Sequence, residues 1–180
     1  ILNDAKNDDN IRVVVFSSTS DSFSAGNDLV DFKNNPPIED DAPVYEFVRT
    51  LARFEKPIVA AVDGLAVGLG FTMLLHCDFV YVTERSKLIA PFVNLGLVPE
   101  AGSTRLLVDL IGERRAADIL ILGEKVSGQR AVELGIANAV IAIDELESKA
   151  LEVAQTLSEK PKEALKLSKE LIRPRSLILE

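Results

Sequence analysis

A short apolar run that passes directly into a glycine-rich segment limits the fold of this chain more than any other feature. Residues 58–62 read IVAAV, and residues 64–70 read GLAVGLG. Such a run is typical of a buried strand, and the glycines after it permit a tight turn and close backbone packing. The apolar residues 71–77 that follow are predicted to be helical. The junction therefore indicates a strand-to-helix unit of an α/β fold.

Strands and helices alternate along the rest of the chain as well. Further strands are predicted at residues 11–17, 79–83, 88–92 and 137–141. The predicted helices cover residues 44–56, 103–111, 114–122, 127–134, 144–158 and 162–172. Polar loops are expected at residues 18–27 and 34–43, and the second is the better candidate for a mobile segment.

Helices dominate the second half of the chain, and no linker is long enough to divide it. We therefore expect one domain over residues 1–180, with an α/β core at 1–142 and C-terminal helices at 143–180. The chain lacks an initiator methionine and opens on a polar run at residues 3–10. We expect further residues upstream of it.

Composition excludes several classes of function. The chain has 20 Lys and Arg against 28 Asp and Glu, a net charge of -8, and no basic cluster that could follow a nucleic-acid backbone. Cys77 is the only cysteine and His76 the only histidine, so a disulfide framework or a Cys-rich or multi-histidine metal site cannot form within the chain. No apolar stretch approaches the roughly 20 residues of a membrane-spanning helix. We expect a soluble protein with no metal, no nucleic-acid partner and no membrane partner.

The first candidate site is the segment SFSAGNDL at residues 22–29, which follows the first predicted strand. Its composition is common in turns, and a simple turn is the plainer interpretation. The functional alternative is that Ala25 and Gly26 turn a backbone N–H outward, toward an anionic oxygen.

The second candidate is the glycine-rich segment at residues 64–70. Its spacing is G-x-x-x-G-x-G, which differs from the dinucleotide-binding G-x-G-x-x-G, and no Lys-Ser or Lys-Thr pair follows as in a P-loop. Close packing of a helix against a sheet is one interpretation. The other is that an N–H group at this helix start joins the one near Ala25 in an oxyanion hole.

The third candidate is Glu100, within residues 91–104. Pro99 and Glu100 resemble the first turn of a helix, where a carboxylate complements the helix dipole. However, Phe92 and the apolar residues around it would raise the pKa of such a carboxylate, which could then act as a base near neutral pH. The position of His76, by contrast, favours a packed helix over a role as a base.

Five motifs in this order resemble the crotonase, or enoyl-CoA hydratase/isomerase, superfamily. They are SFSAGNDL, KPIVAAVDGLAVGLG, HCDFVYV, APFVNLGLVPEAGSTRLL and GEKVSGQRAVELGIANAV, and the resemblance runs from the predicted strand at residue 11 through the predicted helix that begins at residue 162. The resemblance implies a crotonase-like spiral of ββα turns with a C-terminal helical region, in a homotrimer or dimer of trimers. It also implies an acyl-CoA thioester substrate, with coenzyme A as part of the substrate and no separate cofactor. The family's upstream segment, which contacts coenzyme A, is absent here, so no Lys or Arg is assigned to the coenzyme A phosphates.

The resemblance also assigns roles to individual residues. The backbone N–H groups of Ala25 and Leu69 would hold the thioester oxygen, and Glu100 falls on the catalytic glutamate of 3-enoyl-CoA to 2-enoyl-CoA isomerases. The two glutamates of the hydratases fall at Thr72 and Phe92, so both carboxylates are absent. The substrate-binding residues carried over are Ser24, Gly26, Asp28, Gly68, Gly70, Phe92 and Asn94.

The expected function is therefore that of an enoyl-CoA isomerase in fatty acid metabolism. Two alternatives remain open: an enoyl-CoA hydratase or another acyl-CoA-transforming member of the superfamily, and an inactive acyl-CoA-binding scaffold. The cytoplasm of a bacterium is the default expectation for its location, because nothing in the sequence selects an organelle; the last three residues also differ from the peroxisomal Ser-Lys-Leu address.

Overall fold

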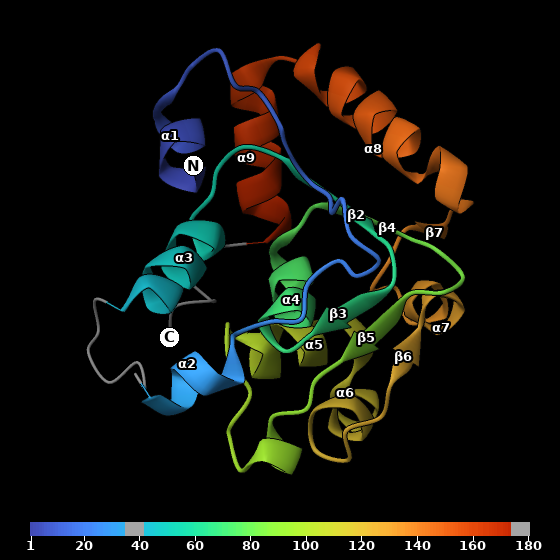
Figure 1. The fold of residues 1–180 in the computed structure, drawn as a ribbon. Coiled ribbons are helices and arrows are strands. Elements are labelled where there is room, and N and C mark those ends of the chain that lie inside the picture. Colours follow the sequence, from blue (N-terminus) through green and yellow to red (C-terminus); the bar gives the residue numbers. More distant parts are fainter. Residues whose placement is uncertain (35–41, 174–180) are drawn as a thin grey trace.

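The computed structural model describes residues 1–34 and 42–173. Figure 1 shows the elements in chain order. They are α1 (Leu2–Asn7), β1 (Val14–Phe16), α2 (Leu29–Asn34), α3 (Pro43–Ala52), β2 (Ile58–Val62), β3 (Leu65–Val67), α4 (Leu69–Thr72), the 3₁₀ helix η1 (Met73–His76), β4 (Phe79–Val82), β5 (Lys87–Ile89), the 3₁₀ helix η2 (Val93–Leu95), α5 (Ser103–Ile111), α6 (Glu113–Leu120), β6 (Val126–Ser127), α7 (Gly128–Glu133), β7 (Ala139–Val140), α8 (Ile143–Ser158) and α9 (Lys162–Ile172).

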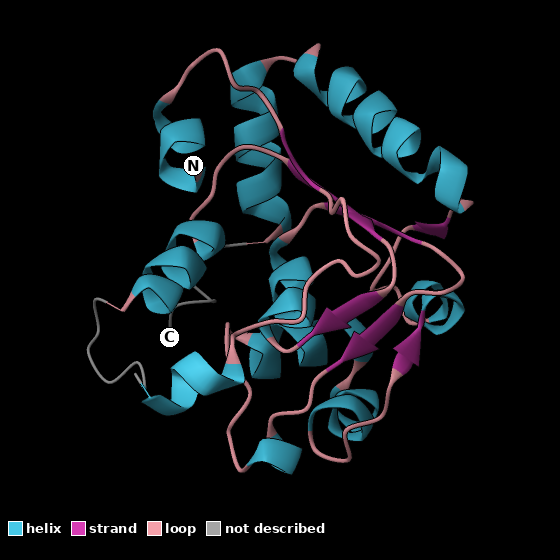
Figure 2. Ribbon diagram, in the orientation of Figure 1, coloured by secondary structure: helices cyan, strands magenta, loops and turns pink. Residues whose placement is uncertain are grey.

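The strands form two sheets, drawn in magenta in Figure 2. One contains four parallel strands in the order β1-β2-β4-β7, with Ala60 paired to Val80, and the other has the order β3-β5-β6. Successive strands enter different sheets before a helix follows, as in β2-β3-α4 and β4-β5-α5. A bridge between Ser24 and Ala66 lets the segment from β1 to α2 follow the same course. The predicted α/β class and its ββα turns are confirmed.

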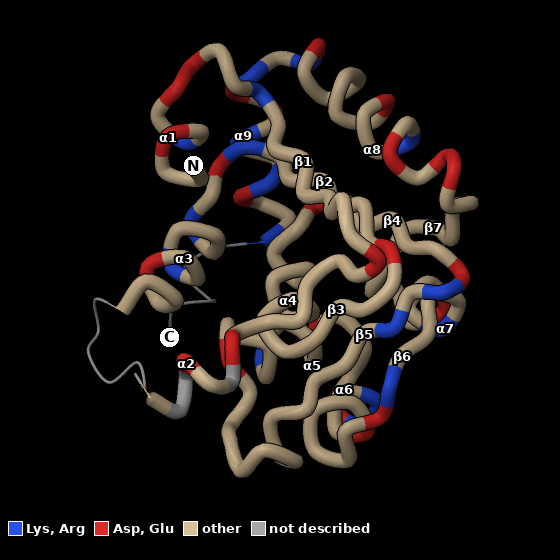
Figure 3. Tube along the Cα trace, viewed as in Figure 1, with Lys and Arg blue, Asp and Glu red and all other residues tan. Residues whose placement is uncertain are grey.

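Strand β2 lies at the centre of the core, and all five of its residues are buried. Ile58, Ala60 and Val62 belong to the larger apolar cluster, whereas Val59 and Ala61 pack with side chains of α8 on the other face. Because helices cover both faces of this parallel sheet, its strands read as continuous apolar runs. β2, β3 and β4 contain no charged residue, and Figure 3 shows the charges gathered along the outer helices and loops.

Helix α9 is fastened to the sheet by a charged group at the start of β2. The Lys169 ammonium donates to Asp78 Oδ2 at 2.7 Å and to the Lys56 carbonyl at 2.8 Å. Asp78 Oδ2 also accepts the backbone N–H of Ile58 at 2.8 Å. Burial lowers the pKa of Lys169, while the carboxylate of Asp78 acts in the opposite direction.

Several short elements differ from the sequence prediction. Helix α1 falls in the polar run at 3–10, and α2 lies between the two predicted loops; neither helix was predicted, and β3 lies within the expected strand-to-helix turn. β1 is shorter than the predicted strand at 11–17 because only three of its residues pair with β2. β6 includes Ser127, which also begins α7 by accepting the Arg130 N–H at 3.2 Å. The predicted mobile loop at 34–43 falls largely on residues 35–41, outside the described residues. No described helix has the length and apolarity needed to cross a membrane.

Candidate active site

A cavity of about 460 Å³ lies where the three candidate segments meet. It is bounded by the residues after β1, the turn from β3 into α4, the start of α3 and the loop between η2 and α5. Aliphatic and aromatic side chains form most of its wall, with Leu95, Leu97 and Val98 on one side and Val44 and Tyr45 on another. Among the described residues that line it, Glu100 is the only carboxylate. The cavity therefore suits a largely apolar molecule that meets one acidic group.

The segment after β1 is held against β3 by backbone hydrogen bonds of Ser24. Its N–H donates to the Leu65 carbonyl at 3.0 Å, and its own carbonyl accepts the Val67 N–H at 2.9 Å. Gly26 follows with a φ of +80°, and a Cβ there would lie 2.5 Å from the Val67 oxygen and 3.5 Å from Leu69 N. Only glycine fits this close approach, which places the Ala25–Gly26 turn beside the start of α4.

The start of α4 supplies the second backbone donor. The Gly68 N–H donates to the Ile89 carbonyl at 2.9 Å, and its φ of +56° turns the chain into the helix. Gly70 packs on Ser24, whose Cβ would lie 2.7 Å from a Cβ at that position. Leu69 is the first residue of α4, so no helical carbonyl accepts its N–H.

The N–H groups of Ala25 and Leu69 have no hydrogen-bond partner in residues 1–34 and 42–173. Both residues line the cavity. Two unpaired N–H groups on adjoining segments are the arrangement that holds a developing oxyanion. The leucine side chain at position 69 is partly buried in the cavity wall and does not remove the backbone donor.

Glu100 lies in the loop before α5, not in its first turn. The helix begins at Ser103 and Gly102 precedes it, so the helix-start interpretation of Glu100 is wrong. Within the described part of the chain, its half-buried carboxylate makes no hydrogen bond or ion pair. Burial alone raises the pKa of Glu100 above its ordinary value of 4.5. A carboxylate in this state accepts a proton more readily at neutral pH than an exposed one does.

The backbone next to Glu100 has an unusual conformation. Ala101 has a φ of +55° and is the one non-glycine residue with a positive φ in the described ranges. Its carbonyl lies 2.8 Å from Nε2 of His76, which is 3% exposed. The sequence correctly indicated that His76 belongs to the core, but it contained no signal for this contact across 25 residues.

The substrate-binding residues carried over by resemblance occupy different surroundings. Gly26, Gly68 and Phe92 line the cavity, whereas Ser24 and Gly70 support the segments behind it. The other two residues, Asp28 and Asn94, are not among the described residues that line the cavity. Asp28 accepts the N–H groups of Val30 and Asp31 in the first turn of α2, and the amide of Asn94 packs beside Gly123. Their role in binding substrate stays a prediction.

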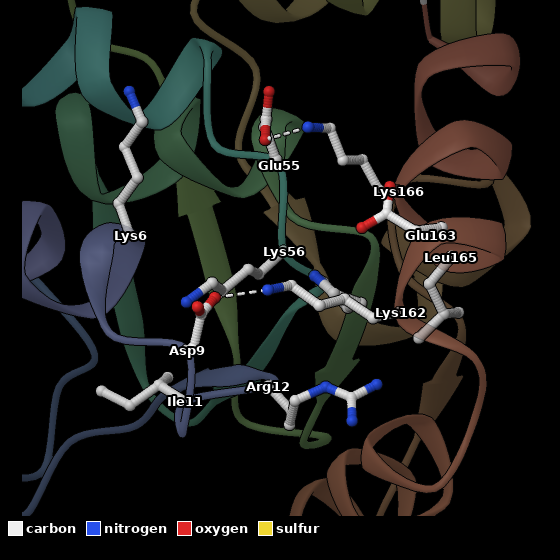
Figure 4. A pocket seen from close by; sticks show the side chains of 11 residues that line it. Lys6, Asp9, Ile11, Arg12, Glu55, Lys56, Lys162, Glu163, Leu165 and Lys166 are labelled. Carbon is white, nitrogen blue, oxygen red and sulfur yellow. Dashed lines mark hydrogen bonds and ion pairs between the residues drawn. The ribbon is translucent and has the colours of Figure 1, made fainter.

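A second cavity, of about 200 Å³, lies between the N-terminal segment and α9 (Figure 4). Its charges are largely paired within the protein: Lys162 bonds Asp9, and Lys166 bonds Glu55 at 2.8 Å. Lys56 donates to the Ala5 carbonyl at 2.6 Å and to the Asp8 carbonyl at 2.7 Å. These charged residues connect the N-terminal segment, the residues before β2 and α9. In the described residues no three His, Cys, Asp or Glu side chains are grouped so as to hold a metal ion.

Comparison with known proteins gives matches along nearly the whole chain. A family model described as Enoyl-CoA hydratase/isomerase matches residues 1–176. Enoyl-CoA delta isomerase 2 of Rattus norvegicus is 34% identical over 178 residues, which are 96% of this chain and 45% of that protein. The 1,2-epoxyphenylacetyl-CoA isomerase of Escherichia coli (strain K12) is 34% identical over 178 residues, which are 95% of this chain and 68% of that protein.

A solved structure of an enoyl-CoA hydratase/isomerase from Pseudoalteromonas atlantica T6c has a TM-score of 0.91 and 36% identity, and covers 99% of this chain and 72% of that one. The predicted crotonase-like spiral is thereby confirmed. The chain spans about half the length of the first curated relatives it matches.

Proposed function

Because the chain belongs to the enoyl-CoA hydratase/isomerase family, we propose that it shifts the double bond of a 3-enoyl-CoA to the 2-position by proton transfer through Glu100. One observation carries the proposal. The cavity combines a single described carboxylate, Glu100, with the unpaired N–H groups of Ala25 and Leu69. This is the set of groups that a one-base isomerisation needs.

The substrate's thioester oxygen would accept the N–H groups of Ala25 and Leu69. As negative charge develops on this oxygen, both hydrogen bonds strengthen. Each such donor typically lowers the activation barrier by about 3 kcal/mol. The apolar wall holds the hydrocarbon part of the acyl group and excludes water from the reacting carbons. Coenzyme A enters as part of the substrate, and the reaction needs no further cofactor.

Proton transfer then proceeds in two steps through one group. The Glu100 carboxylate removes a proton from C2, and the electrons of that C–H bond delocalise over C2, C3, C4 and the thioester oxygen as a dienolate. The carboxylic acid returns the proton to C4, so the double bond moves from C3–C4 to C2–C3. Glu100 is regenerated as a carboxylate, and no water or redox partner is consumed.

Isomerisation is favoured over hydration by what occupies the two hydratase positions. Thr72 is fully buried, with no hydrogen-bond partner for its hydroxyl in the described residues, and Phe92 is a buried part of the cavity wall. Neither residue can act as a second acid or base. Two relatives that are 34% identical are also named as isomerases.

We further propose a homotrimer or dimer of trimers located in the cytoplasm. The exposed apolar residues Leu167, Leu171 and Ile172 on α9 are consistent with burial against another copy. Light scattering on the purified protein tests the assembly: a trimeric or hexameric mass is expected, and a monomer at working concentration contradicts it.

The activity is tested with 3-hexenoyl-CoA and the ultraviolet absorbance of the conjugated 2-enoyl thioester. The wild type is expected to convert it, and Glu100→Gln to lose at least about 10²-fold in kcat, since one acid–base group typically contributes 10²–10⁴-fold. Glu84→Gln, an exposed acid outside the cavity, is the matched control and should retain full activity. Binding of acyl-CoA without turnover would support a scaffold instead, and unchanged turnover in Glu100→Gln would exclude Glu100 as the base.

A further inference from the structure

The Glu100 carboxylate has no side-chain or backbone partner that could orient it within the described residues. Its direction therefore depends on the backbone that carries it. That backbone is a left-handed turn in which Ala101 has a φ of +55° and Gly102 a φ of +66°. Glycine adopts this conformation readily, but alanine does so only when its surroundings compensate for the strain.

Two hydrogen bonds hold this turn: the Ser103 N–H donates to the Glu100 carbonyl at 3.0 Å, and His76 donates to the Ala101 carbonyl. Nε2 lies 2.8 Å from this oxygen, and the ring is buried at the end of η1. Burial lowers the pKa of His76 to about 4, although the hydrogen bond with the Ala101 carbonyl acts to raise it; the charges of Arg173 and Lys169 act in the same direction as burial. The ring is therefore neutral at physiological pH. Because a carbonyl oxygen only accepts, the proton resides on Nε2 and is donated to Ala101.

We propose that His76 is a positioning residue that holds the left-handed turn at Ala101 and so keeps the carboxylate of Glu100 inside the cavity. It contacts neither the substrate nor the reacting atoms, because it does not line the cavity. This inference rests on the proposed role of Glu100. It assigns a function to a buried histidine whose position indicated only core packing.

Three variants separate positioning from packing. His76→Leu replaces the donor by an apolar side chain of similar size, whereas His76→Gln substitutes an amide N–H that is expected to donate to the Ala101 carbonyl. Cys77→Ala is the control, since it removes a neighbouring buried side chain that has no bond to Ala101. Circular dichroism and thermal unfolding establish that each variant is folded.

The first readout is steady-state kinetics with 3-hexenoyl-CoA. We expect His76→Leu to lose up to about 10²-fold in kcat with KM changed by less than about threefold, because a displaced base affects the chemical step more than binding. His76→Gln should recover at least about a tenth of the wild-type kcat. Cys77→Ala should lower the unfolding temperature but not kcat. Equal losses in kcat for His76→Leu and Cys77→Ala would overturn the inference.

The second readout does not depend on turnover. The carboxyl carbon of Glu100 is followed by ¹³C NMR as a function of pH, with its signal assigned by its loss in Glu100→Gln. In His76→Leu its pKa should move down toward 4.5, because a loosened turn exposes the carboxylate to water. If the wild type converts no 3-enoyl-CoA but this shift is observed, the proposed function fails and the positioning role stands. If the wild type is active and His76→Leu alters neither kcat nor the titration, the positioning role is wrong.

Should His76→Leu fail to fold, the wild type itself provides the test. The ¹⁵N shifts of its only histidine report which ring nitrogen carries the proton. The neutral ring with hydrogen on Nε2 is expected throughout the range from pH 6 to 8. A ring with hydrogen on Nδ1, or one protonated in this range, would overturn the inference.

Discussion

Gly26 marks the closest approach between the two segments that supply the N–H donors. A Cβ at this position would lie 2.5 Å from the Val67 oxygen, and the φ of +80° disfavours any other residue. Gly135 has a comparable φ of +77°, but a Cβ there would meet no atom within 4 Å. Substituting alanine at each of these two glycines distinguishes an effect on the oxyanion hole, expected only at Gly26, from the effect of backbone strain, expected at both.

Gly26→Ala is expected to lower kcat at least about 10²-fold, as loss of one oxyanion donor does, and to destabilise the fold by about 1–3 kcal/mol. Gly135→Ala should cost about 1–2 kcal/mol and leave kcat unchanged. Kinetics and urea unfolding of both variants measure these effects. An active Gly26→Ala protein would remove the Ala25 N–H from the proposed oxyanion hole.

Because of Glu100, the activity should fall as the pH is lowered, whereas the contribution of this group to folding stability should fall as the pH is raised. Its pKa is raised by burial, so kcat/KM should fall as the pH drops through a value above 4.5, where the base becomes protonated. The same group contributes most to folding stability below 4.5, and this contribution is lost as the pH rises through the folded-state pKa.

Glu100→Gln should therefore be at least as stable as the wild type at pH 8 and lose this advantage at pH 4. Urea unfolding at both pH values measures the difference. A Glu100→Gln protein that is less stable than the wild type at pH 8 would show that the carboxylate has a stabilising partner in the folded protein.

At the scale of elements, the most buried of the ion pairs of α9 joins the helix to the sheet. Lys169 and Asp78 are mostly buried, and they link α9 to the start of β2 at 2.7 Å. Removing one partner of such a pair leaves the other charge buried without compensation. Lys149 and Glu152 form a more exposed pair at 2.9 Å on α8 and provide the comparison.

Lys169→Met is expected to destabilise the protein by about 3 kcal/mol, whereas Lys149→Met should change stability by less than about 1 kcal/mol. Thermal and urea unfolding measure both. Similar effects of the two substitutions would mean that the ion pair does not secure α9.

The longer elements of this fold could be predicted from the sequence, whereas several of the shorter ones could not. The strand Ile58–Val62 and the helices Ser103–Ile111 and Lys162–Ile172 coincide with their predicted ranges because each has a clear apolar period or run. β3 and β6 have only two or three residues, too few for a period, and they exist because they pair with neighbouring strands. α1 and α2 lack a sufficient apolar stripe of their own.

At the scale of the whole molecule, the sequence indicated which segments form the site but not how they meet. The resemblance placed Ala25, Leu69 and Glu100 together, and the fold brings all three to one cavity. The left-handed turn at Ala101 and the bond from His76 were missed because alanine carries no signal for a positive φ and the contact spans two elements. Contacts of this kind depend on packing across the fold.

The central claim is that one carboxylate moves a proton from C2 to C4 inside a largely apolar cavity. Isomerisation of 3-hexenoyl-CoA deuterated at C2, run as a single turnover in ordinary water, tests it most directly. The account predicts deuterium at C4 in a measurable fraction of the product, because a half-buried Glu100 returns the proton it removed before exchange is complete. Product whose new C4 hydrogen comes entirely from solvent would contradict the direct return by Glu100 of the proton it removed.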